Sequence, residues 1–308
     1  MLAVFLKVLP FFALIGLGYG AARIRFFSEQ SVAAITRFVF YFALSAMLFR
    51  FSATLSISEI FDPRVASAYL FGTAAVYAVA TVVGLIRRQD VQTTAIEAQC
   101  AAIGNTGFLG VPMLAVLLGQ AAVGPIILML SIDLIVFSTL LVILVTGSRE
   151  GRLTPATLKR VGLGLVQNPM IVSIAAGLCV SGSGIGLPAP VAEFLSILGN
   201  AATPGALFAI GASLASKSAE RLAVAGWLSF CKLVLHPAFV ALGAFFVFPV
   251  SSYQAAVMVS AAALPVAGNV FILAQHYGIA PQRVSAAILI STVVSIVTVS
   301  AVIAWVQP

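Results

Sequence analysis

Two short segments of this 308-residue chain place an asparagine among glycine and proline inside otherwise apolar sequence. They span residues 104–112 and 264–269, and we expect the helical backbone to be interrupted in both. Proline removes a backbone donor there, and glycine favours non-helical conformations. Free backbone N–H groups and the side-chain amides of Asn105 and Asn269 can donate hydrogen bonds to an anion without a fixed charge. The candidate substrate-binding residues are Gly104, Asn105, Thr106, Pro112, Pro265, Gly268 and Asn269.

Two charged residues lie inside apolar sequence and are candidates for binding a proton or attracting an anion. Asp133 follows Ile132, and Lys232 lies in the run Phe-Cys-Lys-Leu-Val. A charge at the centre of a membrane costs about 2.5–3.5 kcal/mol on insertion scales, so these side chains should face a protein interior. Asp133 is a candidate carrier of a coupling proton, whereas Lys232 could pair with Asp133 or attract the anion. The alternatives are a purely structural ion pair, or a lysine that extends to the membrane surface.

His236 and Glu97 are the remaining candidates for proton binding. His236 lies one helical turn after Lys232, and an imidazole can titrate near neutral pH; a packed neutral histidine is the alternative. Glu97 lies near the expected start of a helix, where the helix dipole favours a carboxylate, or it could bind a proton. The chain has two histidines and three dispersed cysteines, with no HExxH motif and no CxxC pair. We therefore predict no metal site and no cofactor.

The composition restricts the elements that can position these residues. Apolar residues make up 61% of the chain and charged residues 8%, whereas a soluble domain carries about 25% charge. So few charges cannot cover a soluble globule, and a disordered chain would need low hydrophobicity. The apolar runs are continuous rather than alternating, which argues against a β-barrel. The sequence therefore predicts an all-α polytopic membrane protein and not a soluble enzyme.

The charge-free stretches predict ten membrane-spanning helices. A span needs about 20 residues, so ten spans leave only short connections and no separate soluble domain. The first segment has its arginines after the apolar stretch, which is typical of a retained helix rather than a cleaved signal. The expected helices are about 3–22, 32–51, 65–86, 95–118, 123–146, 166–183, 191–215, 222–248, 253–275 and 284–306.

The basic residues predict the orientation of these helices. The loops on one side hold 11 of the 16 Lys and Arg residues, and the other side holds three. The basic side is normally cytoplasmic, so both termini should lie on the non-cytoplasmic side of the membrane. The net charge of +7 then reflects orientation and is no evidence for nucleic-acid binding. The 11 residues are Arg23, Arg25, Arg87, Arg88, Arg149, Arg152, Lys159, Arg160, Lys217, Arg221 and Arg283.

A polar connector divides the chain into two sets of five expected helices. We predict a first repeat over 1–146, a cytoplasmic linker over 147–165 and a second repeat over 166–308. An odd number of helices per repeat inverts the second relative to the first, which is a common design of secondary transporters. The two interrupted helices are the fourth of each repeat, so they should cross near the bilayer centre and form the binding site. Ordinary proline kinks and interhelical asparagine contacts are the alternative.

The segments 104–112 and 264–271 resemble the two crossover motifs of the auxin efflux carrier family, and the resemblance extends over the whole chain. That family includes the plant PIN carriers and shorter bacterial members, often described as permeases of malonate or other dicarboxylates. The resemblance implies a fold similar to bile-acid symporters and sodium/proton antiporters. Helices 1, 2, 6 and 7 would form a scaffold, and helices 3–5 and 8–10 a transport domain. It also implies a substrate site at Asn105, Pro112, Pro265 and Asn269, and a homodimer.

These observations predict a secondary active transporter of a small organic anion, such as an auxin-like carboxylate or a dicarboxylate, working by an elevator mechanism. No Walker A motif is present, so the sequence does not indicate ATP-driven transport. Coupling to protons is expected over coupling to sodium, because the sequence offers no paired acidic residues near the crossover. A sodium-coupled carrier or cation/proton antiporter of the same fold is one alternative. A channel or receptor-like membrane protein is another.

Overall fold

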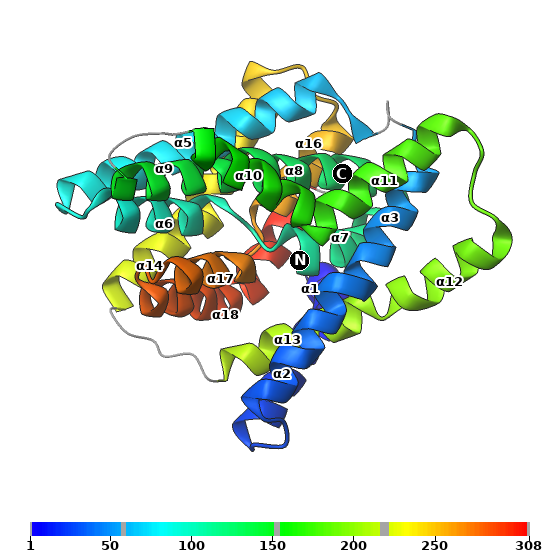
Figure 1. Cartoon of the computed structure of the whole chain (residues 1–308), viewed down its shortest axis with the longest axis horizontal. Helices are drawn as coiled ribbons and strands as arrows, with labels where there is room; N and C mark the ends of the chain where they lie inside the picture. The colour runs from blue at the N-terminus through cyan, green and yellow to red at the C-terminus, as the bar shows by residue number, and fades with distance from the viewer. Residues whose placement is uncertain (1, 57–59, 151–154, 216–221, 307–308) are drawn as a thin grey trace.

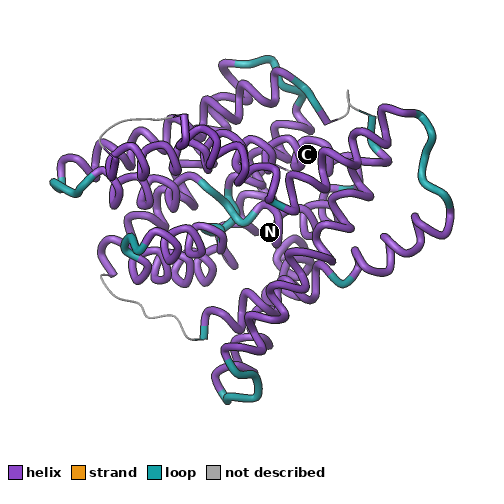
Figure 2. The backbone as a smooth tube through the Cα atoms, in the orientation of Figure 1, coloured by secondary structure: helices purple, strands orange, loops and turns teal. Residues whose placement is uncertain are grey.

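The computed structural model describes residues 2–56, 60–150, 155–215 and 222–306. Helices joined by short connections make up these ranges, and no strand occurs in them (Figure 2). The only β-type pairing among the described residues is one isolated antiparallel bridge between Gly104 and Val266. The predicted all-α class is confirmed. Lys217, Arg221, Arg152 and the middle of the predicted linker lie outside the described residues.

Seven helices in the described part of the chain are long and apolar enough to cross a membrane. The expected helices at 95–118 and 253–275 do not qualify, because both are interrupted. The expected helix at 166–183 does not qualify because its apolar part is short. The seven candidate spans are Phe5–Arg23, Glu29–Thr54, Pro63–Ile86, Gln120–Arg149, Ala189–Leu214, Leu222–Val247 and Pro281–Val306.

The first half of the chain contains two continuous helices and three helices that a π-helical turn interrupts. The side chain of Ser28 caps the start of α2, and Asp62 and Asp90 cap α5 and α6. Three π-helical turns, η1, η2 and η4, lie within these helices. The bounds are α1 (Leu2–Arg23), α2 (Glu29–Phe38), η1 (Val39–Ala43), α3 (Leu44–Thr54), α5 (Pro63–Ile86), α6 (Val91–Ala102), η2 (Thr106–Gly110), α7 (Val111–Leu118), η3 (Gln120–Ala122), α8 (Val123–Ile132), η4 (Asp133–Phe137) and α9 (Ser138–Glu150).

The second half has a similar order of elements. The side chains of Asn168 and Ser251 cap α11 and α16, and Gly184 and Gly278 end α11 and α17 in the left-handed conformation. The bounds are α10 (Pro155–Gln167), α11 (Pro169–Ser183), α12 (Ala189–Asn200), α13 (Ala202–Leu214), α14 (Leu222–Phe230), η5 (Cys231–Leu235), α15 (His236–Leu242), η6 (Gly243–Val247), α16 (Ser252–Ala262), α17 (Gly268–Tyr277) and α18 (Pro281–Val306).

Small residues allow the helices of the two halves to approach closely. α1 packs along α13, and a Cβ added to Gly18 or to Gly211 would overlap the main-chain oxygen of Phe208 or Ile15. α11 packs on α3 in the same way, because a Cβ on Gly177 would lie 2.6 Å from the main-chain oxygen of Phe49. Close helix pairs of this kind are typical of membrane proteins, where van der Waals packing replaces the hydrophobic effect.

Figure 1 shows two groups of helices. α1, α2, α3, α11, α12 and α13 form the diagonal and right-hand part of the view, and α5, α6, α9, α14, α17 and α18 lie to the left. The contacts agree with this view, since α1 packs on α13, α3 on α11 and α12, α5 on α6 and α15, and α14 on α18. The site described next lies where the two groups meet.

Candidate functional site

The two helix interruptions pair with each other. The backbone N–H of Asn105 donates to the oxygen of Pro265 at 2.8 Å, and that of Ala267 donates to the oxygen of Ile103 at 3.1 Å. Gly104 and Val266 form the antiparallel bridge between them. The breaks are the loop segments that follow α6 and α16 in Figure 2. Each break therefore satisfies part of the backbone that the other leaves free, as a nonpolar environment requires.

Four helix ends surround this crossing point. α6 and α16 end there, and η2, which leads into α7, and α17 begin there. Helix starts carry partial positive charge and free N–H groups, and helix ends carry partial negative charge. The crossing therefore has one side that favours an anion and one side that favours a cation.

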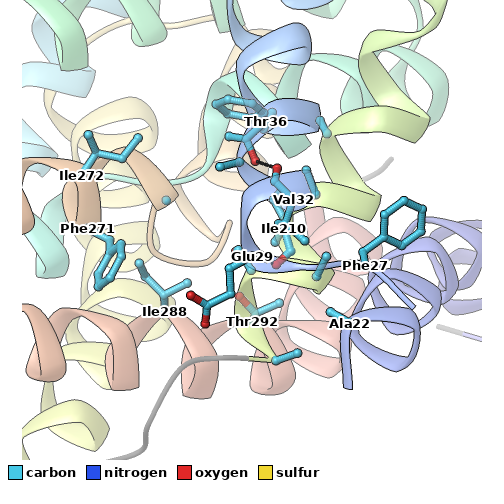
Figure 3. A pocket seen from close by; sticks show the side chains of 18 of the residues that line it. Ala22, Phe27, Glu29, Val32, Thr36, Ile210, Phe271, Ile272, Ile288 and Thr292 are labelled. Carbon is cyan, nitrogen blue, oxygen red and sulfur yellow. Dashed lines mark hydrogen bonds between the residues drawn. The ribbon is translucent and has the colours of Figure 1, made fainter. Parts of the chain in front are cut away.

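A cavity of about 900 Å³ opens beside the two helix starts. Asn105, Gly268 and Asn269 line it, together with the aromatic residues Phe108 and Phe271. Figure 3 shows side chains of α2 on one wall, and Phe271, Ile272 and Ile288 of α17 and α18 facing them. The wall is mostly apolar, with the two asparagines as convergent polar groups, which is the usual make-up of a small-molecule site.

Basic residues lie on the same cavity. Arg23 and Arg25 at the end of α1 and Arg37 near the end of α2 line it, and Glu29 is the acidic residue among the lining residues. Arg37 is exposed and has no acidic partner among the described residues. Sequence reasoning missed Arg37, because a single arginine in an apolar helix gives no sign of the neighbour it faces. A guanidinium group is well suited to hold a carboxylate.

The opposite side of the crossing is filled by Lys232 of η5, which is fully buried. Its Nζ donates to the oxygen of Ala262 at the end of α16 and lies 2.9 Å from Nδ1 of His236. A Cβ added to Gly104 would lie 3.1 Å from this Nζ, so the ammonium group also borders the break after α6. A cation at two helix ends is the favourable arrangement for the helix dipole.

Lys232 and Asp133 do not form the ion pair that the sequence left open as one possibility, because the hydrogen bonds of Lys232 go to His236 and Ala262. Snorkelling is also wrong for Lys232, since its side chain is enclosed. The His236 ring lies 3.0 Å from the hydroxyl of Thr73 on α5 through Nε2, so both ring nitrogens have partners. His236 is therefore a packed, hydrogen-bonded histidine, which was the alternative reading.

Asp133 begins η4 and is 2% exposed. Its Oδ1 accepts a hydrogen bond from the hydroxyl of Tyr69 at 2.9 Å. Tyr69 lies one turn before Thr73 on α5, and its ring centroid is 5.8 Å from that of His236. η2, η4 and η5 each hold or follow a predicted site residue, and such π turns occur often at functional sites.

Glu97 is part of a different cluster. Arg87 donates to its Oε2 at 2.8 Å and Arg283 to its Oε1 at 2.6 Å, and Glu97 itself is 2% exposed. The expectation of a helix-start carboxylate was wrong, because α6 begins at Val91 under the cap of Asp90, and Glu97 lies beyond the first turn. Hydrogen bonds from Thr93 hold the pKa of Asp90 below its usual value.

The predicted binding residues divide into three groups. Asn105, Gly268 and Asn269 line the large cavity. Gly104 lines a separate small void, which Asn105, Gly268 and Asn269 also line. Thr106, Pro112 and Pro265 are buried beside the breaks and are not on the cavity wall; Pro112 is in the first turn of α7, where proline is tolerated. Within the described ranges, no group of three metal-binding side chains occurs.

Comparison with known proteins gives two findings. The family described as "Membrane transport protein" matches residues 3–303. A protein of Rhizobium meliloti (strain 1021) named "Putative malonate transporter" is 32% identical over 301 residues, which cover 95% of this chain and 92% of the relative. Both matches extend over both interrupted helices and the whole cavity.

Proposed function

The chain belongs to the membrane transport protein family, the family of the auxin efflux carriers, and from this premise we propose that it is a secondary active transporter of a small organic anion. The family assignment agrees with the resemblance of the crossover motifs. It indicates a membrane transporter.

The observation that carries the proposal is the cavity at the two helix starts. Asn105 and Asn269 reach it from the two breaks, and Arg23, Arg25 and Arg37 line it from α1 and α2. Amide donors, free backbone N–H groups and guanidinium groups all favour an anion. At the crossing, neutral amides rather than charged groups would hold the substrate carboxylate, and the arginines lie nearby. The attraction between site and anion is then moderate, so the anion can also dissociate.

The proposed architecture has ten spanning helices in two inverted repeats, 1–146 and 166–308, joined by the linker 147–165. In this scheme α6 with α7 and α16 with α17 are the fourth helices of the two repeats. The scaffold consists of α1–α3 and α11–α13, and the transport domain consists of α5–α9 and α14–α18. The grouping of helices in Figure 1 supports this division, and a homodimer remains part of the proposal.

An elevator-type movement fits the position of the cavity. Its walls come from α1, α2 and α13 on one side and from α17, α18 and Asn105 on the other, so it lies between the two proposed domains. Arg23 and Arg25 belong to the predicted cytoplasmic side, which makes this conformation the inward-facing one. Both termini would then lie on the outer side of a bacterial inner membrane. Sliding of the transport domain along the scaffold would carry Asn105 and Asn269 to that side.

The substrate class that we propose is a small carboxylate, with malonate as the first compound to test. The name of the Rhizobium relative supports this choice, because the relative is similar over nearly its whole length. The coupling ion that we propose is the proton.

The test is uptake of labelled malonate by liposomes that contain the purified protein, with an imposed pH gradient. Asn105→Ala and Asn269→Ala should each reduce uptake to near that of empty liposomes. Asn200→Ala, at an exposed position at the end of α12, is the matched control and should keep wild-type uptake. Equal uptake by all four proteins would reject the site.

The same liposomes separate the alternatives. A sodium gradient that drives uptake without a pH gradient would indicate a sodium-coupled carrier. Sodium or proton exchange without movement of any carboxylate would indicate an antiporter. Flux that rises linearly with malonate concentration and never saturates would indicate a channel. Binding of malonate without flux would indicate a receptor.

A further inference from the structure

Two buried oxygen atoms beside the crossing have no hydrogen-bond partner. They are Oδ2 of Asp133 and Oδ1 of Asn269. Buried polar atoms are almost always paired, so each such atom in a folded protein needs an explanation. Here both residues line the same small void, with a volume of about 20 Å³. That is about the size needed to hold one water molecule.

The residues that line both spaces separate this void from the large cavity. Asn105 and Asn269 are lining residues of both spaces, and so are Phe108 and Gly268. Asp133 lines only the void and not the cavity. The Asn269 amide therefore has one end available to Asp133 and one end available to a ligand. Rotation about its last side-chain bond exchanges the oxygen and the NH₂ group between these two positions.

The Asp133 carboxyl group can pair with Asn269 in either protonation state. An ionised carboxylate only accepts hydrogen bonds, so it would draw the NH₂ group of Asn269 toward the void and leave the amide oxygen facing the cavity. A protonated carboxyl group can donate, so it would pair with the amide oxygen and leave the NH₂ group facing the cavity. Only the second arrangement offers donors to an anion.

We propose that Asp133 is the proton site of this transporter and that the Asn269 amide couples the proton to the anion. A proton from the solvent binds Oδ2 of Asp133, and the new O–H donates to Oδ1 of Asn269 directly or through one water molecule. The NH₂ group of Asn269 then donates to a substrate carboxylate, so one proton enters with each anion. The inference rests on the proposed function and adds the coupling site to it.

The surroundings of Asp133 suit this role. Tyr69 of α5 donates to Oδ1 and leaves Oδ2 open to the void. The hydrogen bonds of Lys232 of η5 go to His236 of α15 and to Ala262, and none goes to Asp133. Among the described residues that line the void, Asp133 is the only one that can be ionised. No other carboxyl group competes for a proton there.

Asp133→Asn is the decisive variant, because the Asn NH₂ group imitates the protonated carboxyl group as a permanent donor. We would measure malonate binding to the detergent-purified protein by titration calorimetry, at several pH values above the second ionisation of malonate. Wild-type affinity should fall about tenfold per pH unit once Asp133 ionises, as expected for one coupled proton. Asp133→Asn should keep the high affinity at every pH. Asp90→Asn, an exposed cap that asparagine can replace, should behave as wild type.

A second measurement needs no variant of Asp133. Titrations of the wild-type protein in two buffers of different ionisation enthalpy give the number of protons taken up with malonate. We expect an uptake of about one proton per malonate at pH values where Asp133 is ionised in the free protein. In Asn269→Ala, the remaining affinity should no longer change with pH although Asp133 is present.

The outcomes separate this inference from the proposed function. Malonate that does not bind wild-type protein at any pH would reject malonate as the substrate. Binding without proton uptake, or an unchanged pH dependence in folded Asp133→Asn, would reject Asp133 as the proton site. An unchanged pH dependence in Asn269→Ala would reject the amide as the coupling group.

Discussion

Two carboxylate groups, each on a side chain that is 2% exposed, lie in different regions of this protein. Glu97 has an arginine on each oxygen, from the connection after α5 and from the start of α18. Asp133 has a tyrosine on one oxygen and no partner on the other. Burial alone therefore does not separate the two residues; the number of partners does.

The difference indicates which region is built for stability and which for binding. In the Glu97 cluster the charges satisfy each other and join α5, α6 and α18. Around the crossing and its cavity, Asp133 has an oxygen without a hydrogen-bond partner and Arg37 has no acidic partner in the described part of the chain. Such unpaired groups are typical of a site that binds a ligand or a proton. Four substitutions test this difference.

Glu97→Ala should have the largest effect. It leaves Arg87 and Arg283 without a carboxylate, and breaking a buried ion pair costs about 3–5 kcal/mol. We expect the low end of that range, because the two arginine side chains are 29% and 14% exposed. The check is thermal unfolding in detergent, with Glu193→Ala on the exposed face of α12 as the control. Equal unfolding temperatures for the two variants would contradict a structural role for Glu97.

Asp133→Ala should reduce stability less than Glu97→Ala does, and it should reduce transport more. The Tyr69 hydroxyl loses its acceptor, which costs about 1–3 kcal/mol. Uptake of malonate driven by a pH gradient should fall to the level of empty liposomes, because no group remains to bind the proton. Unfolding and uptake are measured on the same preparation. If Asp133→Ala transports normally, the two carboxylates do not differ in function.

Arg37→Gln extends the comparison to the basic residues. Arg37 lines the cavity without an acidic partner, so a second carboxylate of the substrate is its expected ligand. The dissociation constant for malonate should rise about tenfold, or about 1.4 kcal/mol. A monocarboxylate of similar size should be affected much less. Arg64→Gln, at an exposed position in the first turn of α5, is the control. A uniform loss of affinity for both ligands would argue against a specific contact.

Arg23→Gln should have the smallest effect. Arg23 is exposed and lies at the end of α1, so it acts on an approaching anion over a distance. Initial uptake should fall about twofold at low ionic strength and match wild type at high ionic strength, where such fields are screened. Uptake measured at the two salt concentrations checks this, and a salt-independent loss would place Arg23 in direct contact with substrate.

The helical membrane class and the two breaks could be predicted, because both depend on local sequence. Apolar runs set the spans, and the proline and glycine around Asn105 and Asn269 set the interruptions. The spacing of Lys232 and His236 also placed them one turn apart. The described residues contain seven long helices against ten expected, because of the same breaks and the short apolar part of α11.

The partners of the site residues could not be predicted, because they come from distant parts of the chain. Tyr69 reaches Asp133 across 64 positions, and Arg283 reaches Glu97 across 186. Sequence reasoning also placed Glu97 too near a helix start, since the cap at Asp90 was not recognised. The side of α2 that Arg37 presents to the cavity depends on packing that periodicity alone does not give.

The mutual pairing of the two breaks has a consequence for biogenesis. The main-chain oxygen of Ile103 accepts from Ala267, and the N–H of Asn105 donates to Pro265, and the ribosome adds both partners only after a further half of the chain. Until then these two main-chain groups of the nascent first half lack a hydrogen-bond partner, and lipid cannot supply one. Assembly of the core must therefore be completed late, and chains that terminate before the second break should be cleared by membrane proteases.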